Sequence, residues 1–177
     1  MKMEETFIEG LLICTPTIHS DERGWFCETF VSKNFNIDFV QDNHSKSMIK
    51  GTLRGLHLQI SPMAQTKLVR CTRGVLLDVA VDLRPQSPTY KKWLSIELSE
   101  TNHKQLFIPQ GFAHGFVTLK DNTEIQYKVD NYYSKEHDRV IRYNDPELNI
   151  DWGFSGMITL SQKDEAAPLL KNTELVV

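Results

Sequence analysis

Residues 74–82 constrain the fold of this chain more than any other segment, because their side chains alternate with a period of two. Val75, Val79 and Val81 fall on one face of an extended chain, whereas Asp78 and Asp82 fall on the other. This period is that of a β-strand. The segment therefore predicts a strand with one apolar face and one mixed face.

Other segments repeat this pattern, and turn residues separate them. Residues 93–98 and 123–129 alternate in the same way. Proline, asparagine and aspartate occur in the stretches 84–88, 121–122 and 144–146, where the chain is expected to turn. Many short strands divided by turns are typical of an antiparallel sandwich or barrel.

The most economical architecture is one all-β domain that spans residues 1–177, an antiparallel β-barrel of the jelly-roll type whose interior can hold a small ligand. A few short peripheral helices are expected, at 32–35 and at 163–170, with Pro168 at the edge of the second. Residues 7–13 have the alternating apolar character of an edge strand, which could pair across a dimer or within its own sheet.

Charge and composition exclude several classes of protein. A net charge of -3 argues against a broad nucleic-acid surface, which usually shows as a basic face. No apolar run approaches the roughly 18 residues of a membrane helix, and the first residues lack the apolar region of a secretory signal. The cysteines, Cys14, Cys27 and Cys71, are widely spaced and odd in number, as expected for reduced thiols. These features predict a cytoplasmic protein.

Residues 54–70 gather groups that can hold an anion and move a proton. Arg54, His57 and Lys67 supply a guanidinium, an imidazole and an ammonium, and His114 adds a second imidazole within the apolar segment 108–116. In a regular strand, Arg54 and His57 would point to opposite faces. Both reach one site only if the strand begins after Arg54 or bulges at Gly55.

Taken together and in order, these segments resemble the dTDP-4-dehydrorhamnose 3,5-epimerases. The matching segments are 41–45, 53–59, 65–69, 78–84, 87–89, 108–116, 127–128, 132–133, 144–146 and 161–164. The resemblance implies a cupin-like jelly roll, a homodimer and an isomerase without a cofactor. The implied reaction inverts C3 and C5 of a nucleotide-linked 4-keto-6-deoxy sugar, with dTDP-4-dehydro-6-deoxy-D-glucose as substrate and dTDP-4-dehydro-L-rhamnose as product, in polysaccharide biosynthesis.

The resemblance also implies a role for four residues in proton transfer. His57 would be the base, because the ordinary pKa of histidine lies near neutral pH. Asp164 would fix the tautomer of that histidine. Tyr127 would act as the acid on the opposite face of the sugar, and Lys67 would stabilise the oxyanion at C4. Taken alone, each of these side chains could equally serve the core or the solvated surface.

A second group of residues is implied to bind the substrate. Arginine and lysine suit a diphosphate, amide groups suit thymine, and an aromatic ring can pack on the base, in part from a partner subunit. The predicted substrate-binding residues are Arg23, Phe26, Glu28, Gln41, Asn43, Arg54, His114, Tyr133 and Lys163.

Three alternatives remain open at this point. A metal-dependent oxygenase would share the pattern Pro109-x-Gly111-x-x-His114, but metal cupins usually add His-x-His and a glutamate, whereas this chain has Gln59 and Lys67 near His57. No metal is therefore predicted. A 3-epimerase, or a relative specific for GDP-linked or heptose substrates, would use the same base. A non-catalytic nucleotide-sugar-binding barrel would not need a base, a carboxylate and an acid together.

Overall fold

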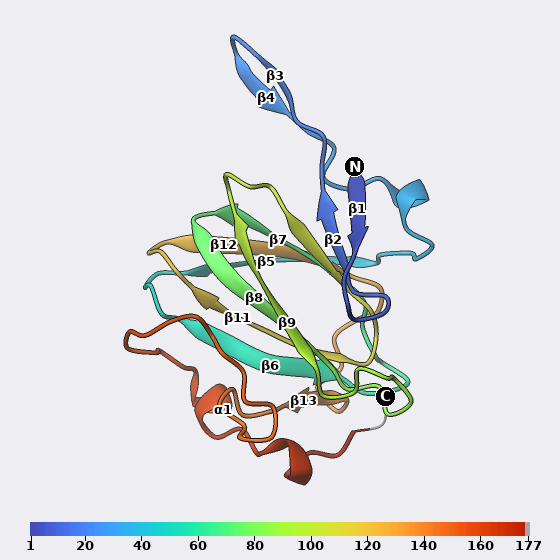
Figure 1. Ribbon diagram of the computed structural model, residues 1–177, viewed down its shortest axis with the longest axis vertical. Coiled ribbons are helices and arrows are strands. Elements are labelled where there is room, and N and C mark those ends of the chain that lie inside the picture. The colour runs from blue at the N-terminus through green and yellow to red at the C-terminus, as the bar shows by residue number, and fades with distance from the viewer. Residues whose placement is uncertain (176–177) are drawn as a thin grey trace.

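The computed structural model describes residues 1–175 and consists of two antiparallel sheets that face each other, with a separate hairpin (Figure 1). The larger sheet contains, in spatial order, β1 (Lys2–Glu5), β2 (Leu12–Thr15), β10 (Gln105–Ile108), β7 (Lys67–Arg73), β12 (Thr123–Val129) and β5 (Gln41–Ser47). The smaller sheet contains β13 (Asp138–Val140), β6 (Leu53–Gln59), β11 (Phe112–Thr118), β8 (Val75–Asp82) and β9 (Trp93–Ser99). The expected all-β jelly roll is confirmed.

The five-stranded sheet is buried on both of its faces. Phe112 and Phe116 on β11 point between the sheets into one apolar cluster, whereas Ala113 and Val117 point outward into another. The C-terminal segment covers that outer face and contributes Trp152, among others, to the second cluster. Strand β8 alternates as predicted, and its valine face is the one that the C-terminal segment covers.

A β-bulge in β6 changes which side chains share a face. In the pairing with β11, His57 lies opposite His114 and Arg54 lies opposite Phe116, so the register shifts by one residue between these pairs. Gly55 has a positive φ of 138°, and a Cβ atom there would lie 2.6 Å from the Cα atom of Gly115. Only glycine suits that conformation and that close approach. Of the two alternatives, the structure has the bulge at Gly55, and Arg54 and His57 reach one side of the sheet.

The two predicted helical segments are both present only as short helical turns. The first is a 3-10 turn, η1 (Ser32–Asn34), close to the expected position. The expected helix at 163–170 is wrong as a continuous element, because the chain forms α1 (Gln162–Glu165) and then a separate turn, η2 (Leu170–Asn172). Pro168 lies between them and has no N–H to donate, and its carbonyl accepts a hydrogen bond from the backbone of Arg142 instead.

The prediction of an edge strand at 7–13 is wrong for residues 7–11, whereas Leu12 and Ile13 belong to β2 and pair within their own sheet. The edge of the larger sheet is β1, which pairs with β2, so the N-terminal strands pair within their own sheet. Between them the chain turns, with the hydroxyl of Thr6 bonded to the backbone of Ile8 and with Gly10 at a φ of 83°. Phe7 remains 66% exposed in this turn.

A short hairpin extends away from the two sheets at the top of Figure 1. It consists of β3 (His19–Asp21) and β4 (Gly24–Phe26), and all six of these residues are exposed. Among them, Trp25 is 60% and Phe26 is 64% exposed. No helix within residues 1–175 is long and apolar enough to cross a membrane.

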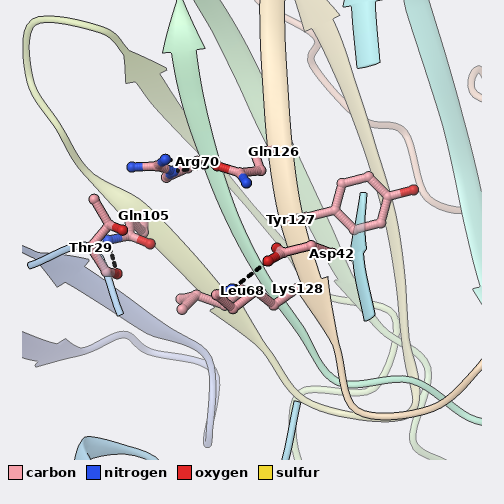
Figure 2. Close-up of a pocket in the computed structure, with 8 residues that line it drawn as sticks. All are labelled: Thr29, Asp42, Leu68, Arg70, Gln105, Gln126, Tyr127 and Lys128. Carbon is pink, nitrogen blue, oxygen red and sulfur yellow. Dashed lines mark hydrogen bonds and ion pairs between the residues drawn. The ribbon is translucent and has the colours of Figure 1, made fainter. Parts of the chain in front are cut away.

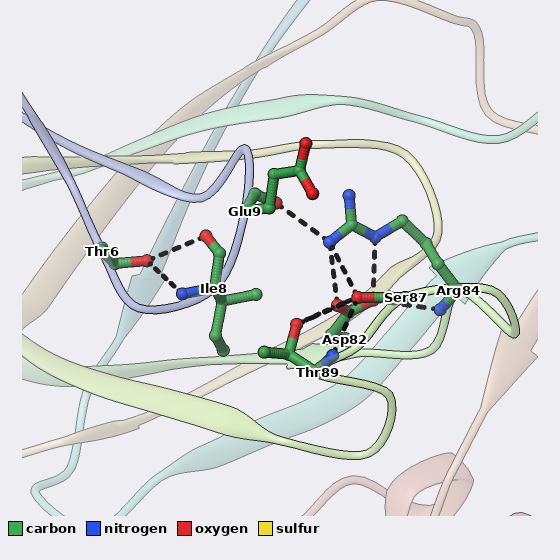
Figure 3. Close-up of polar contacts among 7 residues, drawn as sticks. All are labelled: Thr6, Ile8, Glu9, Asp82, Arg84, Ser87 and Thr89. Carbon is green, nitrogen blue, oxygen red and sulfur yellow. Dashed lines mark hydrogen bonds and ion pairs between the residues drawn. The ribbon is translucent and has the colours of Figure 1, made fainter.

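A buried carboxylate fixes the loop after β8 (Figure 3). The fully buried side chain of Asp82 accepts hydrogen bonds from the guanidinium and backbone of Arg84 and from the hydroxyls of Ser87 and Thr89. The same guanidinium donates to the carbonyl of Glu9, which ties this loop to the N-terminal turn. Burial disfavours the charge, but these hydrogen bonds outweigh it and lower the pKa of Asp82 to about 2.

We expect Asp82→Asn to destabilise the fold by about 3 kcal/mol at pH 7, because it leaves a half-buried guanidinium without its anion. The pKa of Asp82 is lowered on folding, so its contribution is present above about pH 4 and is lost as the pH falls towards 2. Urea denaturation should therefore show the difference from wild type shrinking between pH 5 and pH 2.

The matched control is Glu147→Gln, which removes the surface ion pair with Lys91 and should cost less than about 1 kcal/mol. A cost of Asp82→Asn that stays constant down to pH 2 would show that the charge of Asp82 does not stabilise the loop.

Candidate active site

A cavity of about 330 Å³ opens between the sheets and collects most of the predicted site residues. Eight of the thirteen line it: Arg54, His57, Lys67, His114, Tyr127, Tyr133, Lys163 and Asp164. They come from both sheets and from the C-terminal segment, so residues far apart in sequence meet here. The remaining lining residues are Ser45, Leu58, Gln59, Gln65, Phe116, Asp138 and Ser161.

His57 and Asp164 form a histidine–carboxylate pair at this cavity. The Nε2 atom of His57 lies 2.5 Å from Oδ1 of Asp164, and the histidine is 35% exposed while the carboxylate is 3% exposed. Ser161 donates its hydroxyl to the other carboxylate oxygen at 2.7 Å and accepts from the backbone N–H of Asp164 as the cap of α1. The second imidazole nitrogen of His57 is left for a ligand.

The charge of Asp164 is fixed by its hydrogen bonds. Burial raises the pKa of this carboxyl, but hydrogen bonds from His57, Ser161 and the backbone of Gly55 outweigh burial, and the net pKa lies below its ordinary value. Asp164 is therefore ionised at neutral pH. An ionised partner both orients the imidazole and stabilises its protonated form.

Lys67 is a buried cation beside this pair. The residue is 8% exposed, and its ammonium donates to the carbonyl of His57 at 3.4 Å. Burial lowers the pKa of Lys67 to about 8, although the carboxylates of Asp78 and Asp138 raise it. At neutral pH the ammonium remains charged, with few protein acceptors around it. Such a group is well prepared to bind negative charge that enters the cavity.

A second histidine–carboxylate pair lies deeper between the sheets. Nε2 of His114 is 2.7 Å from Oδ1 of Asp78, and both side chains are buried. Burial lowers the pKa of His114 more than Asp78 raises it, so the imidazole is neutral at pH 7. Oδ2 of Asp78 is the only buried side-chain oxygen or nitrogen in residues 1–175 without a hydrogen-bond partner.

Tyr127 reaches the cavity from the sheet opposite His57. It lies on β12 of the larger sheet, whereas His57 lies on β6 of the smaller sheet. Burial raises the pKa of the Tyr127 hydroxyl more than the charge of Arg54 lowers it, so the phenol keeps its proton at neutral pH. A ligand held between the sheets would therefore meet an imidazole on one side and a phenol on the other.

At the mouth of the cavity, one carboxylate joins two predicted binding residues. Oδ2 of Asp138 accepts from the ammonium of Lys163 at 2.5 Å and from the hydroxyl of Tyr133 at 3.1 Å. Tyr133 is 59% exposed, and Arg54 is also exposed. Arginine, lysine and an open aromatic ring at one mouth suit a ligand with phosphates and a flat base.

Five predicted residues are not brought to this cavity within one chain. Arg23 and Phe26 lie on the projecting hairpin, where Arg23 pairs with Asp21, and Glu28 follows the hairpin. Gln41 and Asn43 lie on β5, half-buried and hydrogen-bonded to each other, and Asn43 is paired in register with Tyr127. The two amide side chains are thus near the cavity, whereas the hairpin residues are apart from it.

Sequence reasoning missed several residues that line the cavity. Ser161 stands three residues before Asp164, a spacing typical of a helix cap, and this signal could have identified it. Asp78 does not line the cavity but holds His114 there, and it could have been noticed as a charge on a strand with few polar residues. Gln59 follows His57 by two residues on β6, and this spacing could have identified it. Asp138 carries no comparable signal, because its position depends on pairing between β13 and β6. Within residues 1–175, no group of three or more histidine, cysteine or acidic side chains is arranged to hold a metal ion.

A smaller cavity of about 70 Å³ lies on the outer side of the larger sheet (Figure 2). The polar side chains there form hydrogen bonds with their neighbours: Arg70 donates to Gln126, Lys128 donates to Asp42, and Gln105 donates to the carbonyl of Thr29. In Figure 2 the ring of Tyr127 points away from these side chains. Because its polar groups already bond one another and its volume is small, this cavity is a poor candidate for a nucleotide sugar.

Comparison with known proteins gives a consistent family. A family model described as dTDP-4-dehydrorhamnose 3,5-epimerase matches residues 5–172. A dTDP-4-dehydrorhamnose 3,5-epimerase from Salmonella typhimurium is 49% identical over 172 residues, which cover 94% of this chain and 93% of the relative.

Two solved structures are similar over nearly the whole chain. One is the dTDP-6-deoxy-D-glucose-3,5-epimerase of Legionella pneumophila in complex with dTDP-4-keto-L-rhamnose, with a TM-score of 0.92, 45% identity and coverage of 97% of this chain and 93% of that chain. The other is a 3'-monoepimerase from Streptomyces bikiniensis in complex with dTDP-quinovose, with a TM-score of 0.89, 32% identity and coverage of 96% and 88%.

We expect Lys67→Met to stabilise the protein by about 2 kcal/mol at pH 7, because it removes a charge from a site that disfavours it. The pKa of Lys67 is lowered on folding, so the wild-type protein pays this cost below about pH 8 and recovers it as the pH rises towards 10.5. Urea denaturation at pH 7 and pH 10 measures the difference, which should shrink at the higher pH.

The exposed residue Lys120 provides the control, and Lys120→Met should change stability by less than about 0.5 kcal/mol at either pH. A loss of stability in Lys67→Met at pH 7 would contradict the burial cost assigned to the ammonium.

Proposed function

Because the chain belongs to the dTDP-4-dehydrorhamnose 3,5-epimerase family, we propose that it is an isomerase that converts dTDP-4-dehydro-6-deoxy-D-glucose to dTDP-4-dehydro-L-rhamnose, inverting C3 and C5. The observation that carries this proposal is the arrangement of His57 and Tyr127 on facing sheets, with the ammonium group of Lys67 in the same cavity. The whole chain acts as one catalytic domain, and the reaction needs no cofactor.

His57 is the base that removes a proton from a carbon next to the C4 ketone. The hydrogen bond to ionised Asp164 supports this role, because it leaves one imidazole nitrogen free to accept the proton and stabilises the imidazolium that results. Asp164 itself stays deprotonated. Ser161 helps to hold the carboxylate in the orientation that the pair requires.

Lys67 stabilises the enolate that forms when the proton leaves. The negative charge develops on the C4 oxygen, and a desolvated ammonium is worth several kcal/mol to such an oxyanion. Its lowered pKa of about 8 still leaves it protonated at neutral pH. His114, neutral and held by Asp78, contacts the substrate from the adjacent strand.

Tyr127 returns a proton to the opposite face of the ring. Its raised pKa keeps the phenol protonated until the enolate is present. Removal from one face and delivery to the other inverts the carbon. The ring must present C3 and C5 in turn, since both carbons flank the same ketone.

The nucleotide lies at the mouth of the cavity. Arg54 and Lys163 bind the diphosphate, Tyr133 packs on the base, and Asp138 holds Lys163 and Tyr133 in place. Gln41 and Asn43 offer amide groups to thymine from β5.

All three cysteines are unpaired thiols, in keeping with a reducing compartment such as the cytoplasm.

Homodimerisation completes this site. Arg23, Phe26 and Glu28 lie on or next to a hairpin that extends away from its own cavity, with Phe26 64% exposed. In the dimer, the hairpin of one subunit reaches the nucleotide of the other. Light scattering should return about twice the monomer mass. A monomer that retains full activity would remove the shared site.

The reaction is tested by following deuterium incorporation with NMR in D2O, using dTDP-4-dehydro-6-deoxy-D-glucose and protein without added metal. We expect exchange at both C3 and C5, because each carbon is next to the ketone and each must lose its proton. Exchange at C3 alone would instead assign the activity of a 3'-monoepimerase, such as the similar Streptomyces bikiniensis enzyme.

The matching variants separate the two proton-transfer roles. His57→Asn should slow exchange at both carbons by about 100-fold or more while dTDP binding is retained. Tyr127→Phe should allow deuterium to enter but should slow net inversion. Unchanged exchange in His57→Asn would show that another group is the base.

A further inference from the structure

Gln59 is a buried amide at the cavity that takes no part in the chemistry proposed above. It follows His57 by two residues on β6 and, like His57, lines the cavity. Gln59 is only 4% exposed. A buried amide costs free energy unless its donors and its acceptor are satisfied, so its partners indicate what it is for.

All three bonds of this amide go to the backbone around Tyr133 and near the end of β6. Nε2 donates to the carbonyl of Tyr132 at 3.1 Å and to that of Met63 at 2.6 Å. Oε1 accepts from the backbone N–H of Ser134 at 2.6 Å. The amide therefore holds the chain immediately before and immediately after Tyr133.

Other hydrogen bonds hold the segment that carries Tyr133 on either side of residues 132–133, from Gln65 to the carbonyl of Asn131 and between the side chains of Ser134 and His137. The segment lies between the end of β12 at Val129 and the start of β13 at Asp138, outside any strand. Tyr132 is 62% and Tyr133 is 59% exposed, so neither ring is anchored in a core. The hydroxyl of Tyr133 reaches Asp138, and Asp138 is the cross-strand partner of Gln59. Gln59 thus holds the backbone on either side of Tyr133, and Asp138 holds its hydroxyl group.

We propose that Gln59 is a positioning residue that holds Tyr133 over the mouth of the cavity in the arrangement that receives the nucleotide base. This inference rests on the proposed function, which gives Tyr133 the base to pack on. An exposed ring fixed before the ligand arrives loses less conformational entropy on binding. A glutamine suits the task because one planar amide supplies two donors and an acceptor.

The test is a double-mutant cycle on dTDP affinity, measured by calorimetry with the full chain. Gln59→Met keeps the volume and removes all three hydrogen bonds, and we expect it to weaken dTDP binding by about tenfold. In a Tyr133→Ala background, the same change should weaken binding by less than about twofold, because Gln59 acts through Tyr133. Turnover at saturating substrate should change less than KM does.

Asn102→Leu is the matched control for the loss of a structural amide. Asn102 also makes three backbone hydrogen bonds, to Ser99, Lys104 and Glu97, but it lines no part of the cavity. This variant should lose stability without losing dTDP affinity. Should Gln59→Met fail to fold, Gln59→Glu keeps the acceptor for Ser134, removes the donors and should weaken binding in the same direction.

Two failures are distinguishable. If wild-type protein does not bind dTDP, the proposed nucleotide is wrong and the role of Gln59 falls with it. If wild-type protein binds dTDP but Gln59→Met binds equally well, or loses the same factor with and without Tyr133, then Gln59 is purely structural and only this inference is overturned.

Discussion

The contact between Gly55 and Gly115 is the constraint on which the site depends. The backbones of β6 and β11 approach so closely there that a side chain on either glycine would meet main-chain atoms. The bulge at this contact places an extra residue on β6, which turns Arg54 to the same side as His57. Without it, the strand would send the guanidinium and the imidazole to opposite faces, and the cavity would lose one of its anion-binding groups.

The polar groups in the interior of the barrel lower the stability of the fold. Lys67, Asp78, His114 and Asp164 are all buried polar residues, and one oxygen of Asp78 has no partner. Burying such groups costs free energy that apolar side chains would not. The fold offsets this cost with an apolar cluster on each side of the five-stranded sheet and with the Asp82 network in the loop after β8. The charged groups that serve the site and the apolar packing that stabilises the fold therefore lie in different parts of the molecule.

Much of this architecture could be predicted from local patterns. Strands such as β8 and β12 are recognisable by their alternation. The meeting of His57, Lys67 and Tyr127 in one cavity was instead implied by the family resemblance, and the structure brings the three together. The errors occurred where local propensity loses to context. At 163–170, Pro168 and a hydrogen bond from the backbone of Arg142 to its carbonyl divide a helix that the charged residues favoured. At 7–11, a turn replaces the expected strand.

One residue that prediction missed, Asp138, depends on pairing between distant strands. Asp138 is recognisable only because β13 adds to the edge of β6, which sets it opposite Gln59 and beside Lys163. No spacing in the sequence encodes that neighbourhood. The hairpin residues pose the converse problem, since the motif that contains Arg23 and Phe26 is clear in the sequence but one chain does not bring it to the cavity.

The C-terminal segment both covers the outer face of the smaller sheet and supplies Asp164, which lies 107 residues after its partner His57. During synthesis on the ribosome, the barrel strands therefore emerge long before the carboxylate that completes the pair. A nascent chain that has made every strand still has an open sheet face and an unpaired imidazole. Burial of that face and completion of the histidine–carboxylate pair both depend on the segment that follows β13.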